Sequence, residues 1–163
     1  MPLTAVLDTS FLVNIKRLQT LQYLCTAFSK VIITPEVWKE SYQFHSQLEE
    51  LPCIKVINLS SEETNEVNSL HDEFTERFSG KHIGEIETLV VAQSRNCFLV
   101  ISDNFAPWYI RERHYKYSKV EIYRGIYYFT RLIEIGILTK NVLEMLEGTY
   151  SQKEIQRMKE KMK

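Results

Sequence analysis

Residues 4–18 read TAVLDTSFLVNIKRL, which is a short apolar run, one aspartate and then a stretch with helical spacing. The run at 4–7 predicts a buried strand. Asp8, Thr9 and Ser10 are residue types that cap a helix N-terminus, so a helix should begin directly after this strand. A buried strand that turns at once into a helix is the first unit of an α/β fold, and it places Asp8 at the strand's end.

The same strand-and-helix unit recurs along the chain. Apolar runs predict further strands at 31–33, 54–59, 98–101 and 120–123. Helical patterns and capping residues predict helices at 19–29, 34–48, 61–78, 83–94, 108–115, 127–135 and 140–147. Strands that alternate with helices predict a central parallel sheet covered on both faces, a three-layer α/β/α sandwich.

Length and composition predict one domain. A chain of 163 residues can bury a core without cross-links, and we expect one α/β domain at 1–150, followed by a polar helix or tail at 151–163. No apolar run is long enough to cross a bilayer, and no secretory leader precedes the first strand, so we expect a cytoplasmic protein with no membrane partner. The three cysteines, Cys25, Cys53 and Cys97, form no metal-binding spacing. We expect them to be reduced, buried thiols.

Two predicted strands end in the same way. Asp8 follows the strand at 4–7, and Asp103 follows the strand at 98–101 by one residue. The carboxyl ends of parallel strands share one edge of the sheet, and ligands of open α/β sheets bind there. The pattern therefore predicts two carboxylates at one binding edge.

Further acids belong to the predicted helices at 34–48 and 83–94. Glu40 lies four residues after Glu36, so both can occupy one helix face. Glu85 and Glu87 open the other helix, and Glu87 precedes an apolar run. Several carboxylates packed together disfavour ionisation, and Mg²⁺ or Mn²⁺ relieves that cost because these cations prefer oxygen ligands. Such a site can activate water for phosphodiester hydrolysis.

A structural explanation competes with the functional one at each acid. Aspartate is among the best N-cap residues, which would be enough to explain Asp8 and Asp103. An acid in the first helical turn is stabilised by the helix dipole, and we favour this explanation for Glu36. The acids at 40, 85 and 87 could be solvated, and Asn14 could be either a site residue or a surface or capping residue. The aromatic residues at 123 and 127–129 fit a core or a dimer interface better than a base-stacking platform.

Four segments, in order, resemble the motifs of PIN domains. The resemblance covers about 140 residues and extends to the segment YRGIYYFTRLIEIGIL at 123–138, which resembles the closing segment of a PIN subgroup. The motif segments are LDTSFLVNI (7–15), ITPEVWKES (33–41), GEIETLVVAQ (84–93) and VISDNFA (100–106). The third segment is similar to a subgroup in which Gly-Glu-x-Glu replaces the commoner aspartate. Asn104 stands where many relatives carry a second acid beside the fourth-motif aspartate.

The resemblance implies a PIN-like sandwich and a metal-dependent endoribonuclease. Asp8, Glu40, Glu87 and Asp103 would be the catalytic acids, and together with Glu85 they would hold Mg²⁺ or Mn²⁺. It further implies an RNA substrate and a homodimer, and relatives of the VapC toxin type are silenced by an antitoxin protein. Because the net charge is −1, any RNA contact must be local or bridged by a cation.

Other classes fit less well. A PIN fold that has lost turnover and serves as a binding module is the main alternative, because Asn104 and the near-zero net charge both favour it. A phosphotransferase of the haloacid dehalogenase type would need an aspartate where Ser10 stands. A dinucleotide-binding domain would need a glycine-rich loop after the first strand, and the sequence has none there.

Overall fold

The computed structural model describes residues 3–139 and 143–161, and this part of the chain contains one parallel sheet of five strands. The strands are β1 (Thr4–Leu7), β2 (Lys30–Ile33), β3 (Ile54–Val56), β4 (Leu99–Ile101) and β5 (Glu121–Tyr123). The helices are α1 (Thr9–Arg17), α2 (Leu24–Ala27), α3 (Pro35–Glu40), α4 (His45–Glu49), α5 (Ser61–Thr75), α6 (Ile83–Ser94), α7 (Ala106–Arg113), α8 (Ile126–Glu134), α9 (Leu143–Leu146) and α10 (Gln152–Lys161), with short 3₁₀ turns at Leu21–Tyr23, Tyr42–Phe44 and Tyr115–Tyr117.

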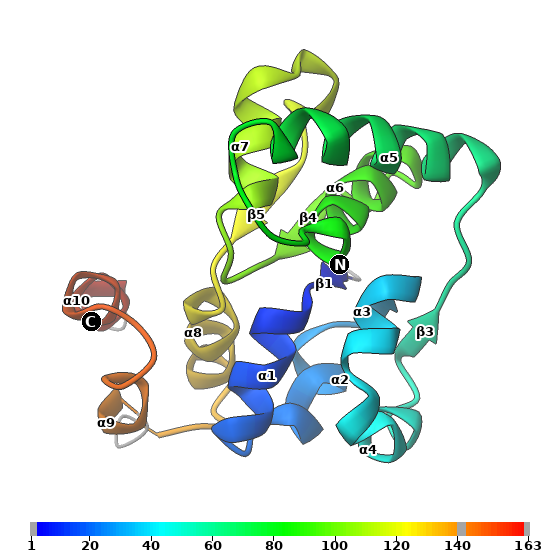
Figure 1. Ribbon diagram of the computed structural model, residues 1–163. Helices are drawn as coiled ribbons and strands as arrows, with labels where there is room; N and C mark the ends of the chain where they lie inside the picture. Colours follow the sequence, from blue (N-terminus) through cyan, green and yellow to red (C-terminus); the bar gives the residue numbers. More distant parts are fainter. Residues whose placement is uncertain (1–2, 140–142, 162–163) are drawn as a thin grey trace.

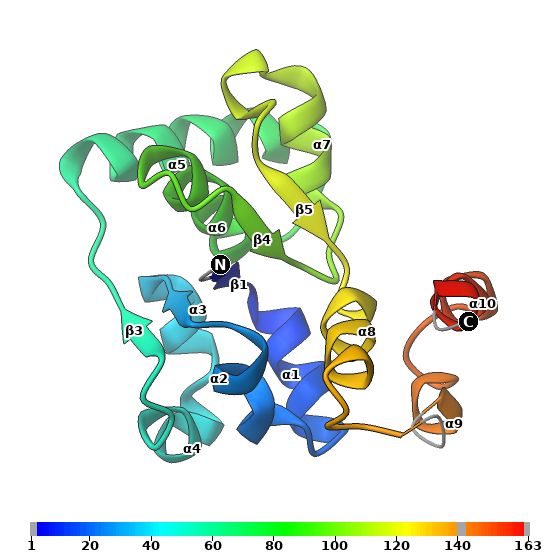
Figure 2. The same cartoon turned by 180° about the vertical axis from the view of Figure 1, so that it is seen from behind.

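The sheet separates two hydrophobic cores. Its strand order is β3-β2-β1-β4-β5, so β1 is central. Because side chains alternate along a strand, Ala5 and Leu7 enter one core and Val6 enters the other. Helices α1, α2 and α8 cover the first face and α5, α6 and α7 cover the second (Figures 1 and 2). The predicted three-layer α/β/α sandwich is therefore confirmed.

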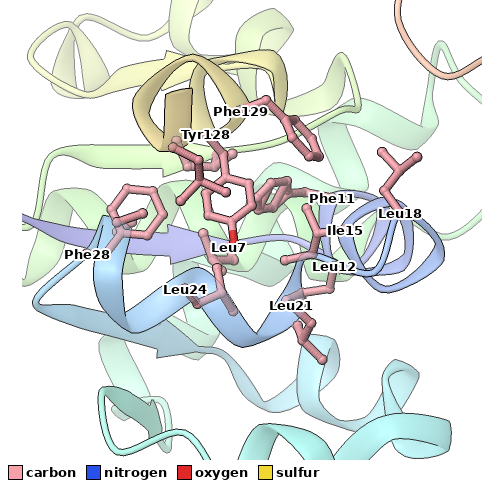
Figure 3. Packing of buried hydrophobic residues seen from close by; sticks show 14 of the residues in the cluster. Leu7, Phe11, Leu12, Ile15, Leu18, Leu21, Leu24, Phe28, Tyr128 and Phe129 are labelled. Carbon is pink, nitrogen blue, oxygen red and sulfur yellow. The ribbon is translucent and has the colours of Figure 1, made fainter. Parts of the chain in front are cut away.

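The first core is built around the β1–α1 unit. Asp8 caps α1 with its side chain, which fixes the direction in which the helix leaves the strand. The Phe11 ring of α1 meets the Tyr128 ring of α8 edge to face, with centroids 5.4 Å apart (Figure 3). Tyr128 and its neighbour Phe129 are fully buried, so these two members of the aromatic cluster are core residues.

Two predicted helices are interrupted. The helix expected at 34–48 ends as α3 at Glu40, and α4 resumes at His45. At the break, the Ser41 hydroxyl donates to the Trp38 carbonyl, so a serine side chain competes with the helical backbone. The helix expected at 19–29 is a 3₁₀ turn followed by the single turn α2. Of the helix expected at 140–147, the first three residues lie outside the described residues.

The C-terminal helix packs against the body of the protein. The segment expected to be a polar helix or tail forms α10, which lies beside α8. Its Ile155 and Met158 are 1% and 2% exposed and belong to the same core as Phe11. None of the helices in the described ranges combines the length and apolarity needed to cross a bilayer.

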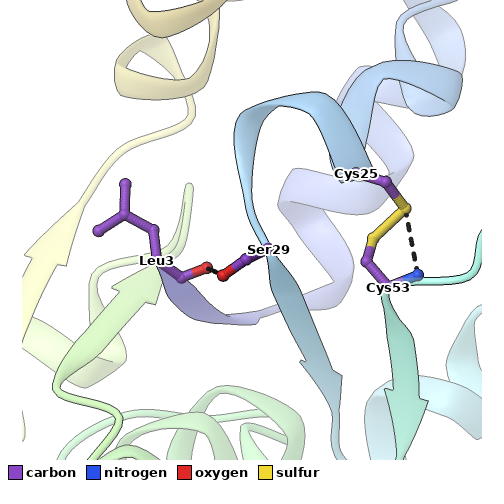
Figure 4. The surroundings of a disulfide bond; sticks show 4 residues. All are labelled: Leu3, Cys25, Ser29 and Cys53. Atoms are coloured by element: carbon purple, nitrogen blue, oxygen red, sulfur yellow. Dashed lines mark hydrogen bonds between the residues drawn. A yellow bond between two sulfur atoms is a disulfide. The ribbon is translucent and has the colours of Figure 1, made fainter. Parts of the chain in front are cut away.

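Two of the three cysteines form a disulfide. Cys25 on α2 is bonded to Cys53, just before β3, with their Cα atoms 5.4 Å apart (Figure 4). The expectation of three reduced thiols is therefore wrong for this pair, although Cys97 is a free, partly buried thiol. The spacing of 28 residues gave no signal, because the two residues meet only when β2, which follows α2, pairs with β3.

We predict that reduction of this disulfide destabilises the fold. The bond closes a loop of 28 residues, and the resulting restriction of the unfolded chain contributes about 3.6 kcal/mol to the free energy of unfolding. A dithiol reductant should lower the midpoint of thermal unfolding, and the Cys25→Ser, Cys53→Ser double variant should unfold at the lower midpoint with or without reductant. Cys97→Ser is the control and should respond to reductant as the wild type does. Equal midpoints for oxidised and reduced wild type would contradict the prediction.

Candidate functional site

The site lies at the carboxyl edge of the sheet, where β1 and β4 end side by side. Leu7 and Ile101 are register partners, and the Asp8 amide donates to the Ile101 carbonyl. Asp8 and Asp103 therefore emerge next to each other. This is the arrangement predicted from the two strand ends.

Asp8 is fully buried and held by three donors. Its Oδ1 accepts from the Phe11 amide at 2.9 Å, and its Oδ2 accepts from the hydroxyls of Ser10 and Ser102. Burial raises the pKa of Asp8 to about 7, against the opposing effect of these hydrogen bonds and with a small contribution from the Asp103 charge. Asp8 is thus both an N-cap and a buried carboxylate whose ionisation is disfavoured without a cation.

Asp103 is partly buried and is also held by three donors. Its Oδ1 accepts from the Gly125 amide at 2.7 Å. Its Oδ2 accepts from the Asn14 side-chain amide and from the Tyr150 hydroxyl, each at 2.8 Å. The Asn14 side chain therefore contacts a candidate site acid, Asp103.

Glu40 and Glu85 lie on the facing helices. Glu40 is exposed at the end of α3, accepts from the Thr9 hydroxyl at 3.0 Å and lies over Gly84 at the start of α6. Glu85 accepts from the Asn104 side-chain amide at 2.6 Å. Burial raises the pKa of Glu85, and the Glu40 charge adds to the rise, so these two carboxylates interact.

Glu87 points to the start of α3. Its Oε1 accepts from the Glu36 amide at 3.0 Å, one of the amides that the first turn of a helix leaves without a partner. Burial raises the pKa of Glu87, as do the nearby Glu36 and Glu40 charges. Glu87 therefore orients the helix that carries Glu40, whereas Glu85 contacts the residue that follows Asp103.

The five predicted acids thus form two groups at one edge. Asp8 and Asp103 make one group, and the glutamates at 40, 85 and 87 make the other. Thr9, which follows Asp8, and Asn104, which follows Asp103, connect the groups through the hydrogen bonds to Glu40 and Glu85. Within the described ranges, no three side chains of His, Cys, Asp or Glu lie close enough together to enclose an ion.

The donor set fits Mg²⁺ or Mn²⁺ in its chemistry. The acids at the edge offer carboxylate oxygens, the ligands these cations prefer, and such cations commonly bind through one or two protein carboxylates and several waters. A cation would also relieve the cost of ionising buried Asp8. The candidate ligands are Asp8, Glu40, Glu85, Glu87 and Asp103, of which one or two would hold the cation, and the exposed Glu40 side chain has room to reorient.

Two residues of the site gave no usable sequence signal. Tyr150 comes from the C-terminal segment, 47 residues after Asp103, and Gly125 lies in the loop between β5 and α8. Gly125 belongs to the segment at 123–138 that resembles PIN domains, but that resemblance assigns it no role. No local pattern marks Tyr150, because its role depends on how α10 packs against α8.

A family model described as a PIN domain matches residues 4–113. The chain therefore belongs to the PIN-domain family, and its fold is of a nuclease type. PIN domains are generally nucleases that use divalent metals. A search of curated proteins gave no match. The matched region contains all five predicted acids, whereas Gly125 and Tyr150 lie beyond it.

We predict that Asp8 makes the metal-free protein less stable as pH rises. Because its folded-state pKa is raised from 3.8 to about 7, the folded protein binds this proton more tightly than the unfolded chain does. Stability should therefore fall between pH 4 and pH 7, by up to about 4 kcal/mol from this group. Asp8→Asn keeps the capping oxygen and removes the charge, so it should be more stable than the wild type at pH 8.

The measurement is urea unfolding of wild type and Asp8→Asn in a chelator, at pH 5 and pH 8. The difference in the free energy of unfolding between the two proteins isolates Asp8 from other titrating groups. A difference that does not change with pH would contradict the assignment.

Proposed function

We propose that this protein is a metal-dependent endoribonuclease that hydrolyses RNA phosphodiester bonds with Mg²⁺ or Mn²⁺. One observation carries the proposal: the acids aligned with the PIN motifs meet at one sheet edge, where Asp8 is fully buried and ionises at a cost. A protein rarely retains a buried carboxylate of this kind without a compensating charge.

The chain's own residues divide the work. Asp8 and Asp103 offer oxygens at the strand ends, and Glu40 and Glu85 offer oxygens from the opposite side. Thr9 orients Glu40, Asn104 orients Glu85, and Glu87 holds the start of α3. A divalent cation bound there supplies Lewis-acid activation of water and neutralises the phosphate charge. An RNA phosphate needs such a bridge, since the site itself is acidic.

Several expectations from the family resemblance accompany this proposal. They are an RNA substrate, a homodimer, a toxin role with an antitoxin partner, and a cytoplasmic location. Each remains a prediction. The nuclease proposal depends only on the RNA substrate and the cation.

A second candidate is a PIN-fold binding module without turnover. Two observations favour it. In the described ranges, no three acids are gathered around one point. Asn104 donates a hydrogen bond to Glu85, whereas an acid at position 104 would add a negative charge to the site. This candidate predicts either no cation binding or cation binding without cleavage of RNA.

Cation binding provides the first test. We predict that Mn²⁺ titrated into the wild-type protein binds saturably by calorimetry, and that Asp8→Asn and Glu85→Gln lose this binding because each removes a charged oxygen ligand. Glu49→Gln, at an exposed position of α4, is the matched control and should bind as the wild type does. Circular dichroism would verify that all variants are folded.

Cleavage provides the second test. The wild type and Asp8→Asn would be incubated with Mn²⁺ and single-stranded RNA, double-stranded RNA or single-stranded DNA, and new ends would be mapped by sequencing. Internal RNA cuts made only by the wild type would support the nuclease. Binding of Mn²⁺ without cuts would favour the binding module, and a folded wild type that binds no Mn²⁺ would overturn the nuclease proposal.

A further inference from the structure

The C-terminal segment returns to the candidate site through one side chain. Tyr150 is 3% exposed, and its ring packs against Phe129 at a centroid distance of 6.0 Å. Its hydroxyl donates to Asp103 Oδ2 at 2.8 Å.

The loop between β5 and α8 is shaped to admit this hydroxyl. A Cβ at Gly125 would lie 2.0 Å from the Tyr150 hydroxyl oxygen and 2.9 Å from Asp103 Oδ2. No side chain other than that of glycine fits there while Tyr150 is in place. The Gly125 amide at the same point donates to Asp103 Oδ1.

The segment around Tyr150 is anchored on several sides. At the start of α10, Ser151 and Glu154 exchange hydrogen bonds in the manner of a capping box. Glu154 also pairs with Arg124, whose guanidinium donates to the Asp103 carbonyl at 3.1 Å. Thr149 accepts from Arg17 of α1. Tyr150 is therefore held at a defined place relative to Asp103.

The three donors leave Asp103 little rotational freedom. A carboxylate has about four lone-pair positions. Asn14 and Tyr150 occupy two on Oδ2 and Gly125 occupies one on Oδ1, which leaves one open position on Oδ1. The carboxylate plane is fixed, and one oxygen remains able to accept a further partner.

We infer that Tyr150 is a positioning residue for Asp103, so that the candidate site is complete only when the C-terminal segment is docked. The inference rests on the proposed function for the role of Asp103 as a cation ligand. Tyr150 lies outside residues 4–113, the region that the PIN family model matches. Hydrogen-bonding partners that orient a metal ligand commonly affect metal affinity by 10- to 100-fold, roughly.

The first measurement needs no metal. Amide hydrogen exchange at Gly125 reports whether Asp103 stays in its orientation, because that amide donates to its carboxylate. Tyr150→Phe should accelerate this exchange about tenfold, since a bond to a charged group is lost. The matched control is Tyr128→Phe, which removes another buried hydroxyl, one bonded to the Thr20 carbonyl away from the acids. Tyr128→Phe should leave the hydrogen exchange rate of the Gly125 amide unchanged.

A second comparison separates local from global effects. In an Asp103→Asn background, Tyr150→Phe should change the Gly125 exchange rate much less than it does in the wild type. Unchanged Gly125 exchange in Tyr150→Phe, or equal acceleration in Tyr128→Phe, would overturn the inference. These outcomes do not depend on whether the protein binds a cation. Failure of the inference about Tyr150 can therefore be distinguished from failure of the nuclease proposal.

Calorimetry extends the test to the cation. In Tyr150→Phe the dissociation constant for Mn²⁺ should rise about tenfold, while in Tyr128→Phe it should equal that of the wild type. Wild-type affinity in Tyr150→Phe would also overturn the inference. If the wild type itself binds no Mn²⁺, the nuclease proposal fails, and the Gly125 exchange rates then decide whether Tyr150 positions Asp103.

Discussion

The rest of the structure depends on the burial of the Asp8 carboxylate at the end of the central strand. Asp8 caps α1, accepts from the hydroxyl of Ser102 at the end of β4, and thereby joins two neighbouring strand–helix connections. Three hydrogen bonds only partly offset the cost of burying its charge, as the raised pKa shows. The same residue therefore organises the fold and keeps a site at the sheet edge that favours a positive charge.

The sequence predicted the fold well because strand and helix patterns are local. The apolar runs ending at Leu7 and Ile101 placed Asp8 and Asp103 at one edge, and the parallel sheet brings them together. The break at Ser41 was missed because a serine hydroxyl that bonds to its own helix leaves no mark in the hydrophobic pattern. The cysteine pair was missed because it forms only through the pairing of β2 with β3.

The placement of the acids at one sheet edge was predictable from the sequence, and their hydrogen bonds were not. Motif order indicated the carboxylates, but only the folded structure distinguishes Glu85, which contacts Asn104, from Glu87, which binds the start of α3. Both acids open the same helix, two residues apart, and therefore point in different directions. The glycine and tyrosine beside Asp103 come from segments that meet it only after α8 and α10 have packed, and no local pattern encodes such a meeting.

The disulfide has a consequence for how the protein responds to a protease. The covalent ring from Cys25 to Cys53 contains β2, α3 and the exposed Tyr42 at the break after Ser41. A single backbone cut at that break would leave both pieces joined through the sulfur atoms. The fragment that carries Asp8 and Glu40 would stay covalently joined to the fragment that carries Glu85 and Asp103 after such a nick, and the two fragments could separate only once the bond is reduced.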